Sequence, residues 1–211
     1  MGLPCLIIGE SGAGKTYSIK NFEPDEVGIF AVEKSLLPFK KNFKIAKHAD
    51  YKTIMSCFKG GTKLKKYIID DSQYLLVNEL FDKAKDTGYG KFTDIAVHFR
   101  DLIHYINHNL PDDVIVYFLH HSETDTNTGK TKAKTVGKML DNQLTVEGCF
   151  SIVLLCAAEG TEHYFITQSD GYTTAKSPED LFDIKIPNDL KAVDTAIREY
   201  YSLNESEEKK K

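Results

Sequence analysis

Short apolar runs recur along the chain and are separated by longer segments with a helical pattern. The apolar runs are Leu3–Ile8, Val27–Val32, Lys66–Asp70, Val114–His120, Phe150–Ala157 and His163–Thr167. The helical patterns are Lys15–Phe22, Tyr51–Phe58, Ser72–Lys85, Phe92–Asn109, Lys138–Val146 and Leu190–Leu203. Buried strands that alternate with helices of this length predict an α/β fold with a mainly parallel central sheet flanked by helices.

The pattern changes after residue 150, because the last two apolar runs have no helical segment between them. Gly160-Thr161 and Asp170-Gly171 read instead as turns, which predicts an antiparallel hairpin added at the sheet edge near the C-terminus. The length and pattern are those of one domain over residues 1–203. Residues 204–211 are almost all charged, and we expect this tail to be disordered.

The first apolar run leads into a glycine-rich stretch that fits the pattern G-x-x-x-x-G-K-[ST]. Glycines let the backbone turn tightly and bring its N–H groups close to phosphate oxygens, and a following helix adds the positive end of its dipole. Lys15 can reach the outer phosphates, and the Thr16 hydroxyl can ligate Mg²⁺. The predicted phosphate-binding residues are Gly9, Glu10, Ser11, Gly12, Ala13, Gly14, Lys15, Thr16 and Tyr17.

Acidic residues end two of the later apolar runs. Asp70 and Asp71 follow a buried strand, as in a Walker B strand, and we expect Asp70 in the Mg²⁺ shell. Adjacent residues of an extended chain point to opposite sides, so Asp71 would orient a water or cap the next helix, although the two roles could be exchanged. Glu33 ends the Val27–Val32 run, where it is either a general base for water attack or a solvated charge.

The strand Val114–His120 ends in the polar residues His120, His121 and Ser122. One of them is placed to touch the outermost phosphate and to report its hydrolysis. The alternative is that a histidine caps the sheet edge with an ordinary hydrogen bond. A metal site is not indicated, because no Cys or His partners follow at ligand spacing.

Residues Thr124–Val136 are rich in Thr, Lys and Gly and lack apolar periodicity, which predicts a long mobile loop. The lysines that suit contact with a phosphate backbone are Lys130, Lys132, Lys134 and Lys138, although a solvated surface loop fits equally well. No aromatic residue is interleaved with them, so the sequence does not signal base stacking. A second group of lysines, between residues 34 and 47, has the same two interpretations.

Composition narrows the function classes without selecting one. A net charge of −4 does not indicate a nucleic-acid-binding protein as a whole, so any basic surface must be local. Four scattered cysteines without a C-x-x-C pair indicate core thiols in a reducing cytoplasm. No apolar stretch reaches 18 residues and no secretory leader begins the chain, so we expect an intracellular protein without a membrane segment.

Together these stretches resemble the RecA-like P-loop ATPases, and among them the small phage-encoded ATP-binding proteins of phage recombination modules. The phosphate loop, a strand ending in Glu33, the Walker B strand and a polar strand tip before a loop follow in that order. The segments that resemble the phage group are Gly137–Gly148, Ala175–Pro178 and Ile186–Leu190. A separate N-terminal oligomerisation segment and a C-terminal DNA-binding domain are not seen.

The resemblance implies an ATP- and Mg²⁺-dependent hydrolase that acts in DNA recombination or replication and binds single-stranded DNA. It also implies a homo-oligomer in which a cation of one subunit meets the outermost phosphate of the next. The chain has two arginines, so we expect this cation to be a lysine, and Lys176 is the candidate. The alternatives are a nucleotide-dependent switch that assists a phage annealing or single-strand-binding protein or a helicase, and a kinase-type transferase.

Overall fold

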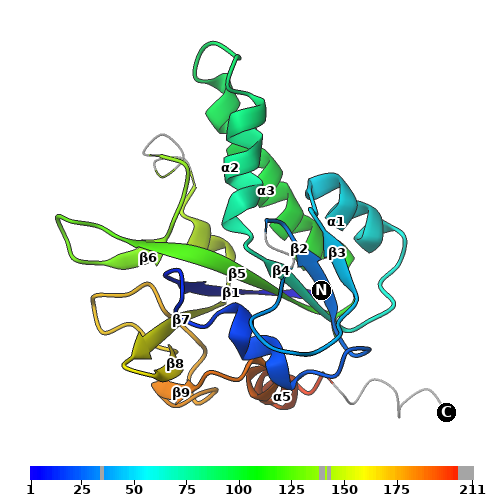
Figure 1. The fold of residues 1–211 in the computed structure, drawn as a ribbon, viewed down its shortest axis with the longest axis vertical. Coiled ribbons are helices and arrows are strands. Elements are labelled where there is room, and N and C mark those ends of the chain that lie inside the picture. Colours follow the sequence, from blue (N-terminus) through cyan, green and yellow to red (C-terminus); the bar gives the residue numbers. More distant parts are fainter. Residues whose placement is uncertain (34–35, 138–140, 142–143, 204–211) are drawn as a thin grey trace.

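A mixed, mostly parallel sheet forms the centre of the protein, as Figure 1 shows. The computed structural model describes residues 1–33, 36–137, 141 and 144–203. Within them nine strands are present, and along the sheet they follow the order β3-β2-β4-β5-β1-β7-β8-β9, while β6 pairs with β5. The strands are β1 Leu3–Gly9, β2 Gly28–Ala31, β3 Ile45–Lys47, β4 Lys66–Asp70, β5 Ile115–Thr124, β6 Thr131–Ala133, β7 Ile152–Glu159, β8 Glu162–Ile166 and β9 Lys185–Pro187.

The pairing confirms the predicted change of direction near the C-terminus. The strands from β3 to β7 in the sheet order pair in parallel. By contrast, β7–β8 and β8–β9 are antiparallel, and the β7–β8 turn falls at Gly160-Thr161 as predicted. The short strands β3, β6 and β9 were not predicted, because three residues are too few to display a period.

Helices cover both faces of the sheet. Side chains of α1 (Tyr51–Lys59), α2 (Gln73–Asp82) and α3 (Gly90–Asn109) pack on one face. The 3₁₀ helix η1 (Thr16–Asn21) and α5 (Leu190–Tyr200) pack on the other, while the 3₁₀ helix η2 (Val146–Cys149) precedes β7. Successive side chains of β5 point to opposite faces of the sheet, so Phe118 faces α3 and Tyr117 faces α5. Within the described residues, no helix is both long and apolar enough to cross a membrane.

The segment after the phosphate loop differs from the predicted helix Lys15–Phe22. It forms the six-residue 3₁₀ helix η1, in which the Ser18 hydroxyl donates to the Lys15 carbonyl at 2.6 Å. Pro24 restricts Glu23 to extended backbone, and Phe22 is already extended, so the helix ends there. The predicted helix Lys138–Val146 lies mostly outside the described residues, as does the charged tail 204–211.

The predicted loop Thr124–Val136 is also different, because β5 and β6 make it a hairpin. Ser122 pairs with Ala133 and Thr124 with Thr131. The Asp125 carboxylate accepts the backbone N–H groups of residues 127 and 128, and Gly129 takes φ 69°, so the turn closes locally. The absence of apolar periodicity reflected a short strand of mostly polar, partly buried residues, not the absence of structure.

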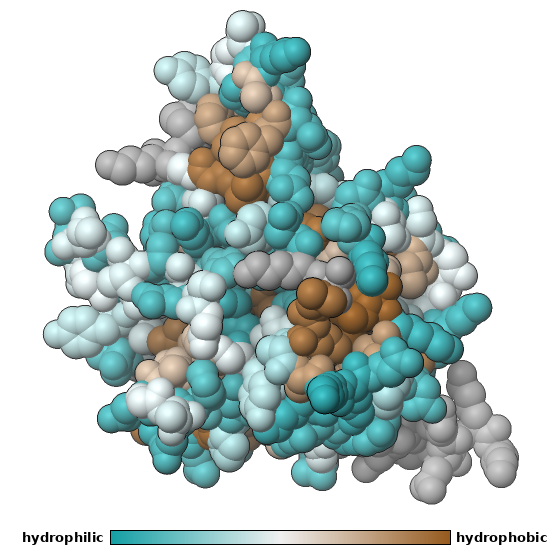
Figure 2. Space-filling model, in the orientation of Figure 1, coloured by the Kyte–Doolittle hydropathy of each residue, from teal (hydrophilic) through white to brown (hydrophobic). Residues whose placement is uncertain are grey.

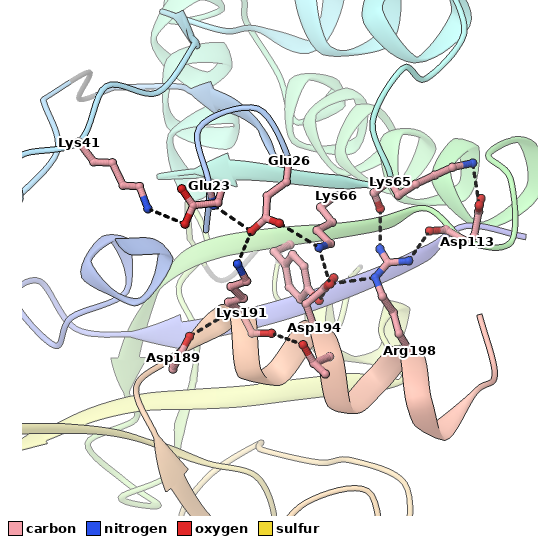
Figure 3. A network of polar contacts seen from close by, with 12 residues as sticks. Glu23, Glu26, Lys41, Lys65, Lys66, Asp113, Asp189, Lys191, Asp194 and Arg198 are labelled. Carbon is pink, nitrogen blue, oxygen red and sulfur yellow. Dashed lines mark hydrogen bonds and ion pairs between the residues drawn. The ribbon is translucent and has the colours of Figure 1, made fainter. Parts of the chain in front are cut away.

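A buried ion pair fastens α5 to the amino ends of the central strands, as Figure 3 shows. The Arg198 guanidinium donates to the Asp194 carboxylate at 2.8 Å and to the carbonyls of Asp113 and Lys65 at 2.9 and 2.8 Å. Tyr117 donates to the same carboxylate at 2.9 Å. Asp194 and Arg198 are 1% and 6% exposed, so removing Arg198 leaves a buried carboxylate that keeps the contact with Lys66 at 3.3 Å but loses its closest charged partner.

We therefore expect Arg198→Ala to lower the free energy of unfolding by about 3–5 kcal/mol. The chain offers a matched control in its other arginine, because Arg100 is half exposed and meets Asp101 at 3.5 Å. Arg100→Ala should change stability by less than about 1 kcal/mol. Urea denaturation followed by circular dichroism compares the two, and equal effects would show that the buried pair does not stabilise the fold.

Candidate functional site

The phosphate loop Gly9–Thr16 connects the carboxyl end of β1 to η1. Gly12 and Gly14 have φ angles of 85° and 103°, a region that residues with a Cβ rarely adopt. A Cβ at Gly14 would lie 2.5 Å from Nδ2 of Asn188 and 2.9 Å from Nδ1 of His163. Gly14 is therefore required both for the turn and for the close approach of two side chains.

Side chains from the end of the chain hold the carbonyl oxygens of this loop. The Ala13 carbonyl accepts from Nδ1 of His163 at 2.8 Å and from Sγ of Cys156 at 3.1 Å, and Nδ2 of Asn188 donates to the Gly14 carbonyl at 3.1 Å. In a planar trans peptide the N–H points opposite to the C=O. These bonds therefore turn the N–H groups of Gly14 and Lys15 away from His163, Cys156 and Asn188.

Lys15 lies under the loop in this structure. Its Nζ donates to the carbonyls of Gly9 and Glu10 at 2.8 and 2.9 Å, and the residue is 7% exposed. Lys15 is therefore turned toward its own loop and away from solvent. An ammonium group held against its own loop offsets the cost of its burial with charge-assisted hydrogen bonds.

Thr16 and Asp70 meet between η1 and the end of β4. The Thr16 hydroxyl donates to the Asp70 carboxylate at 2.9 Å, which joins the end of the glycine-rich loop to the end of β4. Burial and the neighbouring Asp71 charge raise the pKa of Asp70 to about 6, although Thr16 and Lys15 act in the opposite direction. A buried carboxylate under this electrostatic load is suited to a cation.

The residues fit Mg²⁺, which prefers oxygen ligands and keeps part of its shell for water and phosphate oxygens. Oxygens on adjacent corners of its octahedron lie about 2.9 Å apart, which is compatible with the Thr16–Asp70 spacing. Among the described residues, no group of three His, Cys, Asp or Glu side chains gathers as a metal site. An ion here would therefore depend on the phosphates for further ligands.

Asp71 has a strained backbone at the cavity. Its φ is 60°, a value uncommon for a residue with a side chain, and its carboxylate lies 3.3 Å from Nε2 of His121. The His121 ring also packs edge-on against Tyr74, with 5.8 Å between the ring centroids. The two aspartates thus face different partners, as their adjacency predicts: Asp70 meets Thr16, and Asp71 meets His121.

His120 is fully buried and binds protein groups through both ring nitrogens. Nε2 lies 2.8 Å from the Lys134 carbonyl, so it must carry the proton, and Nδ1 can then accept from the Ser72 hydroxyl at 3.0 Å. Burial lowers the pKa of His120 from about 6.5 to about 4, which keeps the ring neutral. This geometry matches the capping alternative for His120 and leaves His121 as the histidine of the strand tip that faces the cavity.

A cavity of about 370 Å³ lies over the phosphate loop, between the carboxyl ends of β1, β4 and β5. This is where open α/β sheets bind ligands. The lining residues are Ser11, Gly12, Gly14, Lys15, Thr16, Tyr17, Leu36, Pro38, Asp70, Asp71, His121 and His163. The structure therefore brings together the predicted phosphate loop, both aspartates and His121.

Other predicted site residues lie apart from this lining. Glu33 is exposed just beyond β2, where the preceding N–H of Val32 donates to the Asp70 carbonyl. Lys176 is half-buried, and its backbone N–H and C=O both bond with Val153. Val153 pairs with Leu6 of β1, three residues before the end of β1 that reaches the cavity. Lys130 and Lys134 are exposed on the hairpin, and Lys138 lies outside the described residues.

Comparisons with protein-family models and with curated proteins find no match to this sequence. The functional interpretation therefore depends on the residues and on the geometry of the cavity.

Sequence reasoning missed the residues that hold the phosphate loop in place, namely Cys156, His163 and Asn188. Each lies more than 140 positions from the loop, so spacing gave no signal for the contact. It also missed Leu36 and Pro38 at the cavity rim. The segment around Asn188 stood out in the sequence, but its role as a donor to Gly14 could not be read from it.

We expect the neutral, buried His120 to make stability fall on acidification. The unfolded chain binds a proton near pH 6.5 and the folded chain near pH 4, so stability is lost as the pH falls through this window, by up to about 3 kcal/mol. Denaturation of wild type and His120→Gln at pH 7 and pH 4.5 isolates this contribution, because the glutamine does not titrate. His104→Gln, on the exposed side of α3, is the control and should keep the wild-type pH dependence.

Proposed function

We propose that this protein binds ATP with Mg²⁺ and hydrolyses it as a RecA-like P-loop ATPase. The observation that carries the proposal is the contact between Thr16 and Asp70 at 2.9 Å, on a glycine loop whose carbonyls are held by His163, Cys156 and Asn188. A chance match to the loop pattern would not require a buried carboxylate to meet its threonine.

Different residues of the cavity would bind different parts of the nucleotide. Phosphate oxygens bind the backbone N–H groups of the loop, and Lys15 exchanges its two carbonyl partners for the outer phosphates. Thr16 and Asp70 would hold Mg²⁺, and the ion would supply positive charge against the charge that develops on the phosphates. The rim at Tyr17, Leu36 and Pro38 suits the nucleoside, since Leu36 is 87% exposed beside the cavity.

Water activation is assigned to a carboxylate at the same edge of the sheet. Glu33 is the first candidate, because its strand β2 lies beside β4 and the Glu33 backbone leaves the sheet next to Asp70. Asp71 is the second, because it already lines the cavity and contacts His121. His121 would then meet the outermost phosphate or position the attacking water.

The arrangement of strands supports the RecA-like assignment. Strand β5 lies between the phosphate-loop strand β1 and the acidic strand β4, and its polar tip leads directly into the basic hairpin. By the same resemblance we propose a role in phage DNA recombination or replication, with single-stranded DNA as partner and with homo-oligomers in which Lys176 acts on the next subunit. An annealing or single-strand-binding protein is a further partner of the same kind.

A nucleotide-dependent switch with little turnover is the second candidate. It is favoured by the exposed position of Glu33, which is absent from the described lining of the cavity. A kinase-type transferase receives less support, because Arg198 is buried in the α5 ion pair and Arg100 lies on α3 with Asp101. Neither arginine is available at the cavity to stabilise a transferring phosphoryl group.

Lys15→Ala should abolish ATP hydrolysis. The variant loses the cation for the outer phosphates and also two hydrogen bonds within the loop, so stability should fall by about 1–3 kcal/mol while the protein remains folded. Lys52→Ala is a matched control, since this lysine is exposed on α1 and is not part of the cavity lining. Wild-type turnover by folded Lys15→Ala would refute the ATPase assignment.

Glu33→Gln and Asp71→Asn decide which carboxylate activates water. Each substitution keeps shape and removes one charge, and loss of the general base costs about 10²- to 10⁴-fold in rate. We expect Glu33→Gln to bind ATP·Mg²⁺ normally but to hydrolyse it slowly. The opposite result, with slow turnover in Asp71→Asn alone, would assign the water to Asp71, and wild-type rates in both would contradict a carboxylate base.

A further inference from the structure

The β5–β6 hairpin is held on its outer side by a segment from far along the chain. Thr131 donates its N–H to the Tyr172 carbonyl at 2.7 Å and accepts from the Thr174 N–H at 3.1 Å. Residues 172–174 thus run parallel to β6 and lie beside it. The β5–β6 hairpin and residues 172–174 together are called the ribbon. The buried Glu147 carboxylate of η2 accepts from the Ala133 N–H and from the Thr174 hydroxyl, so it holds both β6 and residues 172–174 in place.

The ribbon presents one large aromatic side chain to solvent. Tyr172 is 66% exposed, while the side chain of the preceding Asp170 accepts its backbone N–H at 2.9 Å and its carbonyl is held by Thr131. A Cβ placed at Gly129, in the hairpin turn, would lie 4.0 Å from the Tyr172 ring. The ring therefore stands beside the tip of the hairpin on a backbone that is fixed on both sides.

Two lysines of the hairpin accompany this ring. Lys130 follows Gly129 directly and is exposed, and Lys134 is exposed at the other end of β6. Lys132 differs, because it contacts the carboxylates of Asp141 at 2.8 Å and Glu123 at 3.3 Å. Among the described lysines that suit contact with a phosphate backbone, Lys130 and Lys134 are therefore the exposed ones.

We propose that this ribbon is a single-stranded nucleic-acid surface on which a base stacks on Tyr172 while Lys130 and Lys134 contact the neighbouring phosphates. The sequence offered lysines without an aromatic partner, and the fold supplies that partner from residue 172. An exposed ring beside one exposed lysine, with a second exposed lysine farther along the same ribbon, is a combination that binds unpaired strands with little sequence preference. The proposal specifies the surface for the DNA partner proposed above.

The character of the ribbon favours nucleic acid over a protein partner. Figure 2 shows mainly hydrophilic colours over the projecting β5–β6 side, whereas the brown areas lie elsewhere on this face of the molecule. A protein partner of usual size would require an apolar centre to its interface.

The absence of tryptophan from the sequence makes a direct test possible. In Tyr172→Trp the introduced indole is the sole tryptophan, and stacking of a base should quench its fluorescence when a thymidine oligonucleotide is added. Tyr89→Trp is the matched control, because Tyr89 is 73% exposed where α3 begins, away from the ribbon. Quenching at residue 89 and not at 172, or equal quenching of Tyr172→Trp by duplex DNA, would overturn the proposal.

Binding constants test the same surface without a fluorophore. Tyr172→Ala should weaken oligonucleotide affinity roughly 5- to 150-fold, while Tyr172→Phe, which keeps the ring, should stay close to wild type. Lys130→Ala and Lys134→Ala should each reduce the slope of log affinity against log salt by about 0.7, whereas Lys132→Ala should leave it unchanged. An unchanged affinity in Tyr172→Ala would overturn the stacking role.

The outcome separates this proposal from the ATPase assignment. A wild-type protein that hydrolyses ATP but binds no oligonucleotide refutes the nucleic-acid surface and leaves the phosphate site intact. Quenching in Tyr172→Trp by a protein that lacks turnover supports the surface and refutes the hydrolase. Anisotropy with a labelled oligonucleotide and a phosphate-release assay on the same preparations provide both measurements.

Discussion

The shape of the phosphate loop depends on hydrogen bonds to its carbonyl oxygens. His163, Cys156 and Asn188 hold the carbonyls of Ala13 and Gly14, and planarity of the peptide then fixes the direction of the following N–H groups. Without these donors a glycine-rich turn would sample many conformations, because glycine loses more backbone entropy on ordering than other residues. The loop is therefore held in one conformation by the antiparallel end of the sheet, whose residues come last in the sequence.

Two carboxylates lie next to each other at the cavity, and their negative charges repel. Asp70 is buried beside a second carboxylate, which raises its pKa to about 6, and Asp71 has an unfavourable positive φ. Lys15 partly offsets this charge while it is bound to its own loop. Under the proposed function, a cation held by Thr16 and Asp70 would reduce this repulsion.

The carboxyl end of β5 connects two parts of the molecule that serve different ligands under the proposals. His121 lies at the cavity, and His120 on the opposite face binds Ser72 and the carbonyl of Lys134. The hairpin with its exposed lysines therefore begins within one residue of the cavity lining. A rigid strand with neutral, buried His120 at its end gives the ribbon a fixed position relative to the aspartates.

The sequence alone determined the elements with a long or strict pattern: β1, β4, α1, α3 and the parallel core were predicted, as were the phosphate loop and the two acidic residues at the end of β4. These features are local, because a strand, a helix period or a glycine turn is written in neighbouring residues. Tertiary structure alone decided that Lys15 is buried, that Thr124–Val136 is a hairpin, and that Tyr172 stands beside Lys130. The Tyr172 position depends on backbone pairing with Thr131, which lies far away in the chain, and a single sequence carries no pattern for such a contact. The Lys15 bonds and the hairpin join nearer residues, but polar positions without an apolar period do not predict them.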